Sequence, residues 1–357
     1  MKPRVAVVYP IAFGPEGIFG GGERYAVELA RALAARTPTR LITFGPTARE
    51  IEVDGLEIHT YEPFRLLRGE QANPFTVGFL RSLRGMDVVH CTAWNTLVTD
   101  VAIGFARATG KRAFVTDVGG GASLTLHRFL PIDRWVHRYL LIAEVGGAEF
   151  LAHRERWRII WAGIDTEKYR PPERPERRGV LFVGRLLPHK GIDVLIRAVG
   201  RDTPLTIVGR PYHGAYFRLL QQLAAGKDVR FVTDASDEQV IRCYQQTAVA
   251  VLPSVNRTVY GDTFPLPELL GFAAMEAMAC GAATICTRVG GLGELMVDGE
   301  TGFLVPPGDP VVLRQRISEL LGDPELAERL GRAARRRIEG HFTWAQVAER
   351  CLAAYRS

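Results

Sequence analysis

The sequence has no closely spaced cysteine pair, no long apolar run and little lysine. Its five cysteines include no CxxC pair, no eighteen successive residues are apolar, and only five lysines stand among 45 basic residues. An odd number of cysteines without paired spacing argues against a disulfide framework or a zinc site and favours a reducing cytoplasm. Without a long apolar run, the sequence predicts no membrane-spanning helix.

The length of the chain predicts the number of domains, and its net charge indicates the kind of partner it binds. At 357 residues the chain is too long for one ordinary hydrophobic core, so we expect two domains. The net charge of +6 suits anionic partners such as phosphates or an acidic membrane surface, and it is too small to indicate nucleic-acid binding.

Short apolar runs alternate with helical patterns along the chain, which is typical of parallel sheets covered by helices. Arg4–Tyr9 reads as a buried strand and Glu23–Arg36 as an amphipathic helix. The proline-rich segment Arg170–Arg178 resembles a linker, and the pattern restarts at strand Gly179–Val183. We therefore expect two α/β domains with a ligand bound between them, outside the carboxyl ends of the strands. Further strands are expected at 41–44, 56–60, 87–91, 113–117, 139–143, 158–161, 205–208, 230–232, 249–252, 283–286 and 302–305, and further helices at 191–199, 267–280, 310–321, 323–338 and 343–355.

A glycine-rich loop follows the first strand. Glycines allow backbone N–H groups to approach an anion at a helix N-terminus. There is no GK[ST] sequence, so the loop is not a Walker loop, and no acidic residue ends the second strand as a dinucleotide site requires. Two interpretations remain, a phosphate or substrate loop and a purely structural one. The glycines are Gly14, Gly17, Gly20, Gly21 and Gly22.

Two cations follow the strand Gly179–Val183. Arg185 comes directly after Gly184, and Lys190 stands just before the helix that begins near Gly191. A helix N-terminus and two fixed cations at one end of a strand favour an anion, and a diphosphate suits the fork of arginine and the point charge of lysine. The alternative is a pair of solvated surface cations.

Two glutamates lie eight residues apart in the segment Pro267–Gly281. On one continuous helix Glu268 and Glu276 would be separated by a rise of about 12 Å, which is too far for an acid/base pair. They could hold two hydroxyl-bearing parts of one ligand. Glu276 stands among apolar residues and needs a hydrogen-bond partner if it is buried, so an internal structural bond is the alternative.

Together these segments resemble a known family over nearly the whole length. The chain is similar to retaining glycosyltransferases of family 4, which have the GT-B architecture of two facing Rossmann-like domains and an interdomain cleft. The motifs are specific in the second half: the segment 180–198, the E-x7-E spacing of Glu268 and Glu276, and the segments 289–296 and 298–307. Segment 162–169 resembles the interdomain segment, and 342–344 the start of a helix that crosses back onto the first domain.

The resemblance implies an activity and a set of roles. The enzyme would move a sugar from a UDP-, GDP- or other nucleotide-sugar to an acceptor in bacterial polysaccharide or glycolipid synthesis, with no cofactor and no metal. Arg185 and Lys190 would neutralise the diphosphate, Glu268 would contact the sugar and Glu276 the ribose. The implied catalytic residues are Arg185, Lys190, Glu268 and Asp117, and the implied donor-binding residues are Gly21, Gly22, Gly184, Arg185, Lys190, Gly271, Phe272 and Glu276.

Some positions depart from the family pattern. Val118 stands where many members have a histidine near the donor sugar, and Asp117 is the candidate substitute. Leu269 and Leu270 replace the usual glycine and phenylalanine, and Thr233 replaces a glycine. Two other functions fit the same architecture, a nucleotide-sugar epimerase and a non-catalytic nucleotide-sugar-binding protein.

The predicted division is an acceptor-side domain at 1–165, a nucleotide-sugar domain at 166–340 and a crossing helix at 341–357. The loop 256–266 reads either as a donor-side lid or as an insertion. Segments that mix basic and apolar residues, at 64–68, 79–84 and 127–140, suit either a peripheral contact with the inner membrane face or packing on the domain's own core.

Overall fold

The computed structural model describes residues 2–12, 21–67, 73–118, 124–127, 129–173 and 176–357. The chain divides into two compact units. Unit 1 comprises Met1–Gly163 together with Trp344–Ser357, and unit 2 comprises Ile164–Thr343.

Unit 2 is built on a sheet of six parallel strands, in the order β13-β12-β11-β14-β15-β16. The strands are β11 (Arg178–Val183), β12 (Leu205–Val208), β13 (Val229–Val232), β14 (Thr247–Leu252), β15 (Ala283–Thr287) and β16 (Phe303–Val305). The helices are α3 (Ile192–Ala198), α4 (Gly214–Ala224), α5 (Asp237–Gln246), α6 (Phe272–Ala279), α7 (Leu292–Leu295), α8 (Pro310–Gly322) and α9 (Pro324–His341), with a 3-10 turn at Pro188–Lys190.

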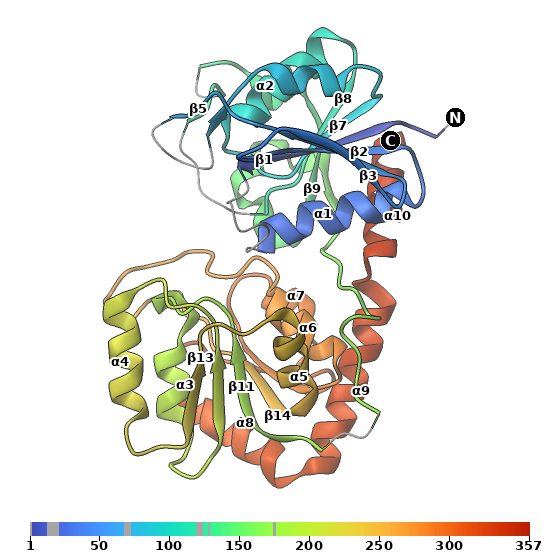
Figure 1. Cartoon of the computed structure of the whole chain (residues 1–357). Coiled ribbons are helices and arrows are strands. Elements are labelled where there is room, and N and C mark those ends of the chain that lie inside the picture. The colour runs from blue at the N-terminus through green and yellow to red at the C-terminus, as the bar shows by residue number, and fades with distance from the viewer. Residues whose placement is uncertain (1, 13–20, 68–72, 119–123, 128, 174–175) are drawn as a thin grey trace. The chain divides into compact units, whose positions relative to one another are not determined.

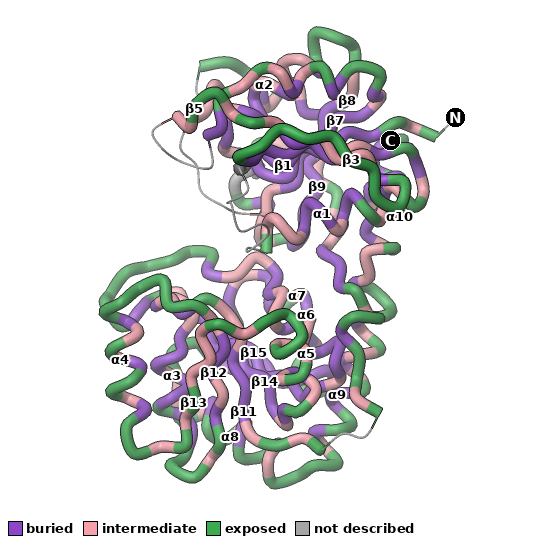
Figure 2. The backbone as a smooth tube through the Cα atoms, viewed as in Figure 1, coloured by how far each residue is buried: buried purple, intermediate pink, exposed green. Residues whose placement is uncertain are grey.

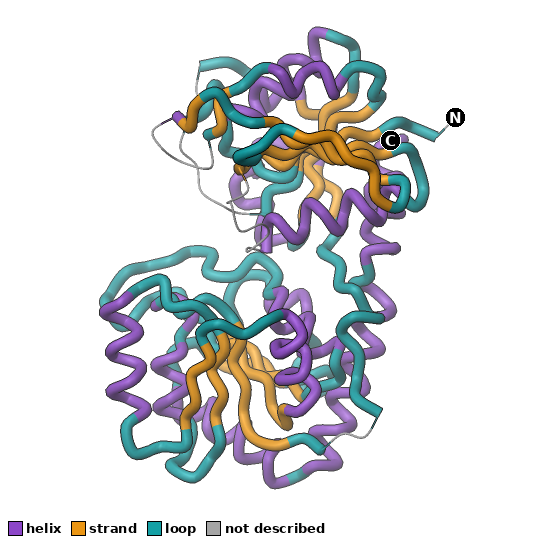
Figure 3. The backbone as a smooth tube through the Cα atoms, viewed as in Figure 1, coloured by secondary structure: helices purple, strands orange, loops and turns teal. Residues whose placement is uncertain are grey.

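Helices cover both faces of this sheet. Residues of α3, α4 and α8 share one hydrophobic core with the sheet, while α5 and α6 pack on its other face (Figures 1 and 3). Every residue of β15 is buried, as are five of the six in β14, which Figure 2 shows as a buried centre. Parallel strands buried on both faces read as continuous apolar runs, which explains why the sequence pattern predicts them.

Aspartate and proline set where the two long helices of unit 2 begin. The side chain of Asp309 accepts the backbone N–H groups of Val311 and Val312, and that of Asp323 accepts the N–H of Leu326. Each aspartate is followed by proline in the first turn, where the missing N–H costs nothing. These two signals start α8 and α9 within one residue of the predicted positions.

Unit 1 is built on an eight-stranded sheet in the order β10-β9-β8-β7-β1-β2-β4-β3, parallel except for the pair β3–β4. The helix α2 (Leu97–Ala108) packs on one face, and α1 (Gly21–Ala34) with α10 (Trp344–Arg356) on the other (Figure 1). The strands are β1 (Val5–Ala12), β2 (Thr39–Phe44), β3 (Arg49–Val53), β4 (Leu56–Tyr61), β7 (Val88–Cys91), β8 (Arg112–Val115), β9 (Val136–Leu141) and β10 (Trp157–Ile159), and a small separate pair is formed by β5 (Arg65–Leu66) and β6 (Pro74–Phe75).

A buried polar contact attaches α10 to the sheet of unit 1. His90, at the end of β7, has its Nδ1 2.7 Å from the hydroxyl of Tyr355 and its Nε2 2.7 Å from Oγ1 of Thr116. All three residues are fully buried, so both ring nitrogens of His90 are satisfied inside the core. His90 is therefore a structural residue.

Segments that mix basic and apolar residues take several forms in unit 1. Residues 79–83 lie in a 3-10 helix (Gly78–Leu83) whose Phe79 and Leu83 are buried in the core, whereas Phe64 and Phe129 are exposed. Among the described residues, no helix has the length and apolar composition needed to cross a bilayer.

Candidate functional site

The predicted cations of unit 2 lie at the carboxyl end of β11. The chain leaves β11 through Gly184 and Arg185 and makes the 3-10 turn Pro188–Lys190 before α3. Gly191 ends this turn with φ of 64°, and a Cβ atom there would lie 2.0 Å from the carbonyl oxygen of Pro253. Only glycine permits this approach, which brings Lys190 against the segment that follows β14.

Lys190 and Ser254 both contact one oxygen of Glu268. The Nζ of Lys190 lies 2.5 Å from Oε1 of Glu268, and the Oγ of Ser254 donates to the same Oε1 at 2.7 Å. Ser254 is fully buried, and the side chains of Lys190 and Glu268 are 15% and 10% exposed. Within the described chain, Oε2 of Glu268 forms no hydrogen bond. The carboxylate is thus fixed through one oxygen, and the other can accept a hydrogen bond from a ligand hydroxyl.

Two glycines hold the backbone of Glu268 in place. The N–H of Gly291 donates to the carbonyl of Glu268 at 3.2 Å. Gly290 has φ of 51°, and a Cβ atom there would lie 1.8 Å from the same carbonyl oxygen. The glycine pair of the segment 289–296 therefore serves to pack against the first glutamate of the E-x7-E motif.

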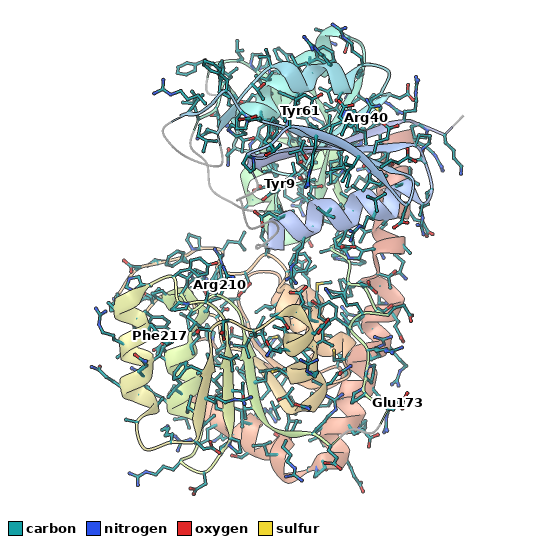
Figure 4. The ribbon with its side chains drawn as sticks, in the orientation of Figure 1. Tyr9, Arg40, Tyr61, Glu173, Arg210 and Phe217 are labelled. Atoms are coloured by element: carbon teal, nitrogen blue, oxygen red, sulfur yellow. The ribbon has the colours of Figure 1, made fainter. Side chains whose placement is uncertain are left out.

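Arg185 is a second cation of this edge, and another arginine follows the neighbouring strand. Arg185 is exposed and forms no hydrogen bond or ion pair through its side chain with any described residue. The carbonyl of Arg210, which follows β12, accepts the N–H of Leu186, and Figure 4 shows Arg210 at the carboxyl end of the sheet. The tripeptide Val-Gly-Arg occurs at 183–185 and again at 208–210, a short repeat that sequence analysis missed.

The two glutamates do not share one helix. The expected helix over Pro267–Cys280 begins only at Phe272, because Gly271 has φ of 81° and acts as its N-cap. Glu268 therefore lies in the loop before α6, and only Glu276 is helical. The N–H groups of Gly271 and Phe272 donate to no described residue, so they remain available at the N-terminus of α6.

Glu276 has an internal partner. The buried hydroxyl of Tyr244 on α5 donates to Oε2 of Glu276 at 2.9 Å. Burial and the carboxylate of Glu276 hold the pKa of Tyr244 well above its usual value, so it remains a donor. The structure thus supports the internal bond for one oxygen of Glu276, and its predicted contact with a ribose stays a prediction.

His189 and the loop 256–266 form the border of this site. Burial, with the charges of Lys190 and Arg185, lowers the pKa of His189 to about 4, so the ring is neutral near pH 7. Its ring lies 4.9 Å from that of Phe264 between centroids. The loop is closed by the bridge between Arg257 and Thr263 and by the N–H of Phe264 donating to the carbonyl of Asn256. The two interpretations of this loop, a lid and an insertion, stay predictions.

The predicted residues of unit 1 lie at the carboxyl edge of its sheet. Gly21 and Gly22 begin α1, and a Cβ atom on Gly22 would lie 3.2 Å from Val118 and 3.6 Å from the hydroxyl of Tyr9, which Figure 4 labels. Asp117 follows β8, where its Oδ1 accepts the N–H of Trp94 at 3.4 Å. Gly14, Gly17 and Gly20 lie outside the described residues.

No metal site is evident in the part of the chain that the structure describes, since no three His, Cys, Asp or Glu residues cluster there. The site in unit 2 contains cations, the open amides of α6 and the fixed carboxylate of Glu268.

The chain is similar to known proteins in sequence and in fold. The family model described as "Glycosyl transferases group 1" matches residues 164–337. A D-inositol 3-phosphate glycosyltransferase of Streptomyces avermitilis is 31% identical over 99% of this chain and 88% of the relative. Another, of Corynebacterium diphtheriae, is 35% identical, in a match that spans 49% of this chain and less than half, 41%, of the relative. The crystal structure of Anabaena HepE in complex with UDP aligns over 98% of both chains, with a TM-score of 0.74 at 17% identity, a likeness of fold.

Fold and relatives together define an enzyme of two Rossmann-like domains, and the predicted GT-B fold is confirmed. The chain belongs to the group 1 glycosyltransferases.

Proposed function

We propose that this enzyme is a retaining glycosyltransferase that moves a sugar from a nucleotide-diphosphate sugar to an acceptor without a metal ion. The observation that carries the proposal is the shared contact of Lys190 and Ser254 with Oε1 of Glu268 at the carboxyl end of the sheet in unit 2. A cation and an oriented carboxylate side by side suit a ligand that carries phosphate next to hydroxyl groups.

Lys190 can donate to Glu268 and to a phosphate at the same time. An ammonium group has three donors, and Glu268 uses one of them. The others can reach phosphate oxygens, with Arg185 and the open N–H groups of Gly271 and Phe272 as further donors. As the glycosidic bond breaks, its electron pair passes to a phosphate oxygen, and these groups stabilise that negative charge in place of a metal ion.

Glu268 is proposed to orient the donor sugar. Its Oε2 is open, so it can accept a hydrogen bond from a sugar hydroxyl while Lys190 and Ser254 hold Oε1. Retention, as in the family that the sequence resembles, requires the acceptor oxygen to bond to the anomeric carbon on the face that the diphosphate leaves, with the proton of the acceptor hydroxyl passing to the departing diphosphate. Glu276 is proposed to bind the ribose and Asp117 to act on the sugar side.

The relatives guide the choice of substrates to test. Anabaena HepE was crystallised with UDP, and the curated relatives are named for D-inositol 3-phosphate. We therefore propose UDP- and GDP-sugars as first donors and D-inositol 3-phosphate as first acceptor, with polysaccharide and glycolipid acceptors next.

A thermal-shift panel of nucleoside diphosphates and nucleotide-sugars identifies the donor, because a ligand that binds the folded state raises the melting temperature. Transfer is then followed with that donor, with and without EDTA, and NMR of the product gives the anomeric configuration. Lys190→Ala should lower kcat/KM by about a hundredfold or more, in line with the loss of a charge-stabilising donor.

Lys168→Ala is the matched control, because Lys168 is also ion-paired, to Asp237 at 2.9 Å, but is far more exposed at 40%. Near-normal turnover of a folded Lys190→Ala enzyme would contradict the proposal. Conversion of the donor to an epimer without an acceptor would instead identify an isomerase.

A further inference from the structure

Unit 1 contains a strongly basic cavity that the proposed function does not use. It has a volume of about 620 Å³. None of the described residues that line it is acidic, and five carry basic side chains. The lining residues are Arg107, Gly110, Lys111, Arg134, Trp135, Val136, His137 and Arg156.

The cavity lies at the amino end of the sheet in unit 1. It is formed where α2 ends at Ala108, where β8 begins at Arg112 and where β9 begins at Val136. Asp117 follows the opposite, carboxyl end of β8. A strand rises about 3.3 Å per residue, so four to six residues separate the two ends by roughly 13–20 Å. The cavity is therefore distinct from the predicted site residues of unit 1.

Two of its arginines have no close side-chain partner, although the charge of Arg134 acts on the neighbouring carboxylate of Asp133. The side chains of Arg107 and Arg134 are exposed and form no hydrogen bond or ion pair with any described residue. Lys111 donates to the carbonyl of Met86 at 2.8 Å, and Arg156 donates to the carbonyls of Asp133 and Val136 at 2.9 Å. None of these side chains donates a hydrogen bond to the last carbonyls of α2, although the backbone N–H of Lys111 donates to the carbonyl of Ala106 at 2.8 Å.

The histidine of the cavity is a further donor with a fixed tautomer. The N–H of Ala113 donates to Nδ1 of His137 at 3.2 Å, where the register of β8 and β9 shifts. Nδ1 is therefore an acceptor, and the proton of the neutral ring lies on Nε2. Partial burial and, as smaller contributions, the charges of Arg112, Arg138 and Arg107 lower the pKa of His137. The repulsion that a protonated His137 would meet is the repulsion that a bound anion would relieve.

We propose that this cavity binds a phosphate-class anion, a phosphomonoester or a diphosphate, through Arg107, Lys111, Arg134 and His137. A cavity with N–H donors on several sides and no carboxylate selects a compact anion with several acceptor oxygens, and guanidinium groups bind phosphate in a bidentate manner. The phosphate can come from a free phosphate ester or from a phospholipid headgroup, which carry the same chemistry.

Because the chain has only five lysines, the acetylation rate of each one can be measured separately and reports on its own surroundings. The five lysines are Lys2, Lys111, Lys168, Lys190 and Lys227, and each can be followed by mass spectrometry after brief acetylation of the folded protein. Pyrophosphate should slow acetylation of Lys111 by about tenfold, the ratio expected for occupancy near 90%, and leave Lys168 unchanged. Lys190 reports separately on the proposed donor site, so the two sites cannot be confused.

The double variant Arg107→Gln/Arg134→Gln removes the two arginines that have no close side-chain partner and should abolish protection of Lys111. Arg329→Gln/Arg336→Gln is the matched control, with the same change of charge at two exposed residues of α9 that have no side-chain partner among the described residues. Its Lys111 should be protected as in the unmodified enzyme. Absence of protection by millimolar pyrophosphate, or equal protection in Arg107→Gln/Arg134→Gln, overturns the proposal.

Vesicles distinguish the two sources of phosphate. Protection of Lys111 by phosphatidylglycerol vesicles but not by phosphatidylcholine vesicles, lost in Arg107→Gln/Arg134→Gln, identifies a lipid headgroup. Protection by pyrophosphate alone identifies a free phosphate ester.

Discussion

Lys190 and Glu268 form an ion pair of 2.5 Å although they lie 78 residues apart in the chain. Lys190 follows β11 and Glu268 precedes α6, so the pair joins two segments at the carboxyl end of one sheet. With both side chains largely removed from solvent, the pair is little screened by salt. Its geometry leads to predictions about the residues around it.

Ser254→Ala should lower kcat/KM for sugar transfer while the enzyme remains folded. Ser254 Oγ donates to Oε1 of Glu268 at 2.7 Å, and a hydrogen bond to a charged group contributes about 1.5–3 kcal/mol. Without it, Glu268 can rotate about its bond to Lys190. We expect kcat/KM to fall about 10–100-fold in transfer assays, with donor affinity changed less. Ser254→Cys, a small residue with only a weak donor, should be intermediate, and an unchanged kcat/KM in Ser254→Ala would show that this bond does not orient Glu268.

Gly290→Ala and Gly293→Ala should have different effects on the free energy of unfolding. The added Cβ would lie 1.8 Å from the carbonyl of Glu268 at Gly290, where φ is 51°, whereas at Gly293 it would meet no atom within 4 Å. Calorimetry should therefore show Gly290→Ala destabilised by about 1–3 kcal/mol. Gly293 lies in α7, so Gly293→Ala should be neutral or more stable by up to about 1 kcal/mol. Equal effects would mean that the loop relaxes freely around Glu268.

Arg185→Ala and Arg210→Ala should each weaken binding of the nucleoside diphosphate that gives the largest thermal shift. Both arginines follow a Val-Gly pair at adjacent strand ends. Loss of one charge-assisted hydrogen bond predicts a fall of about tenfold or more in affinity by calorimetry. Arg185 has no side-chain partner in the described chain, so the melting temperature of ligand-free Arg185→Ala should be unchanged. Arg336→Ala serves as the exposed control, and undiminished affinity in Arg185→Ala would remove it from the site.

The stability of unit 1 should depend on pH through His90. Burial lowers the pKa of His90 to about 3, against about 6.5 in an unfolded chain. Between these values the unfolded state binds more protons, so the free energy of unfolding rises with pH and is level above about 6.5. All five tryptophans belong to unit 1, so their fluorescence during urea unfolding reports this unit alone. His90→Gln, which keeps a hydrogen-bonding side chain, should reduce the dependence between pH 4 and 6.5, and an unchanged dependence would assign it to other groups.

The buried strands, and the helices α8 and α9 that begin with an Asp-Pro pair, were the predictable part of the fold. Apolar runs identified β1, β11 and β14 because both faces of each strand are covered. The antiparallel strand β3 was missed because all five of its residues are exposed and it has no apolar run. The helices α2, α4 and α5 were missed too, although Thr96 and the capping box of Ser236 and Gln239 give local start signals.

The sequence predicted which charged residues gather at the carboxyl end of the sheet in unit 2, but it did not predict their local geometry. Spacing suggested one helix for Glu268 and Glu276, but the positive φ of Gly271 separates them. Ser254 was missed because a serine after a strand carries no pattern, and its role depends on a fold contact with a residue fourteen positions later. Arg210 could have been found, since it repeats the Val-Gly-Arg of the neighbouring strand.

Because α10 belongs to unit 1, the two units can complete their folding in a different order from their order in the sequence. Residues 344–356 leave the ribosome only after all of unit 2 has emerged, yet Tyr355 supplies the hydroxyl that satisfies His90. Unit 2 can therefore fold while unit 1 still lacks its last helix. A nascent chain halted before residue 344 should leave the surface that α10 covers accessible to chaperones and proteases.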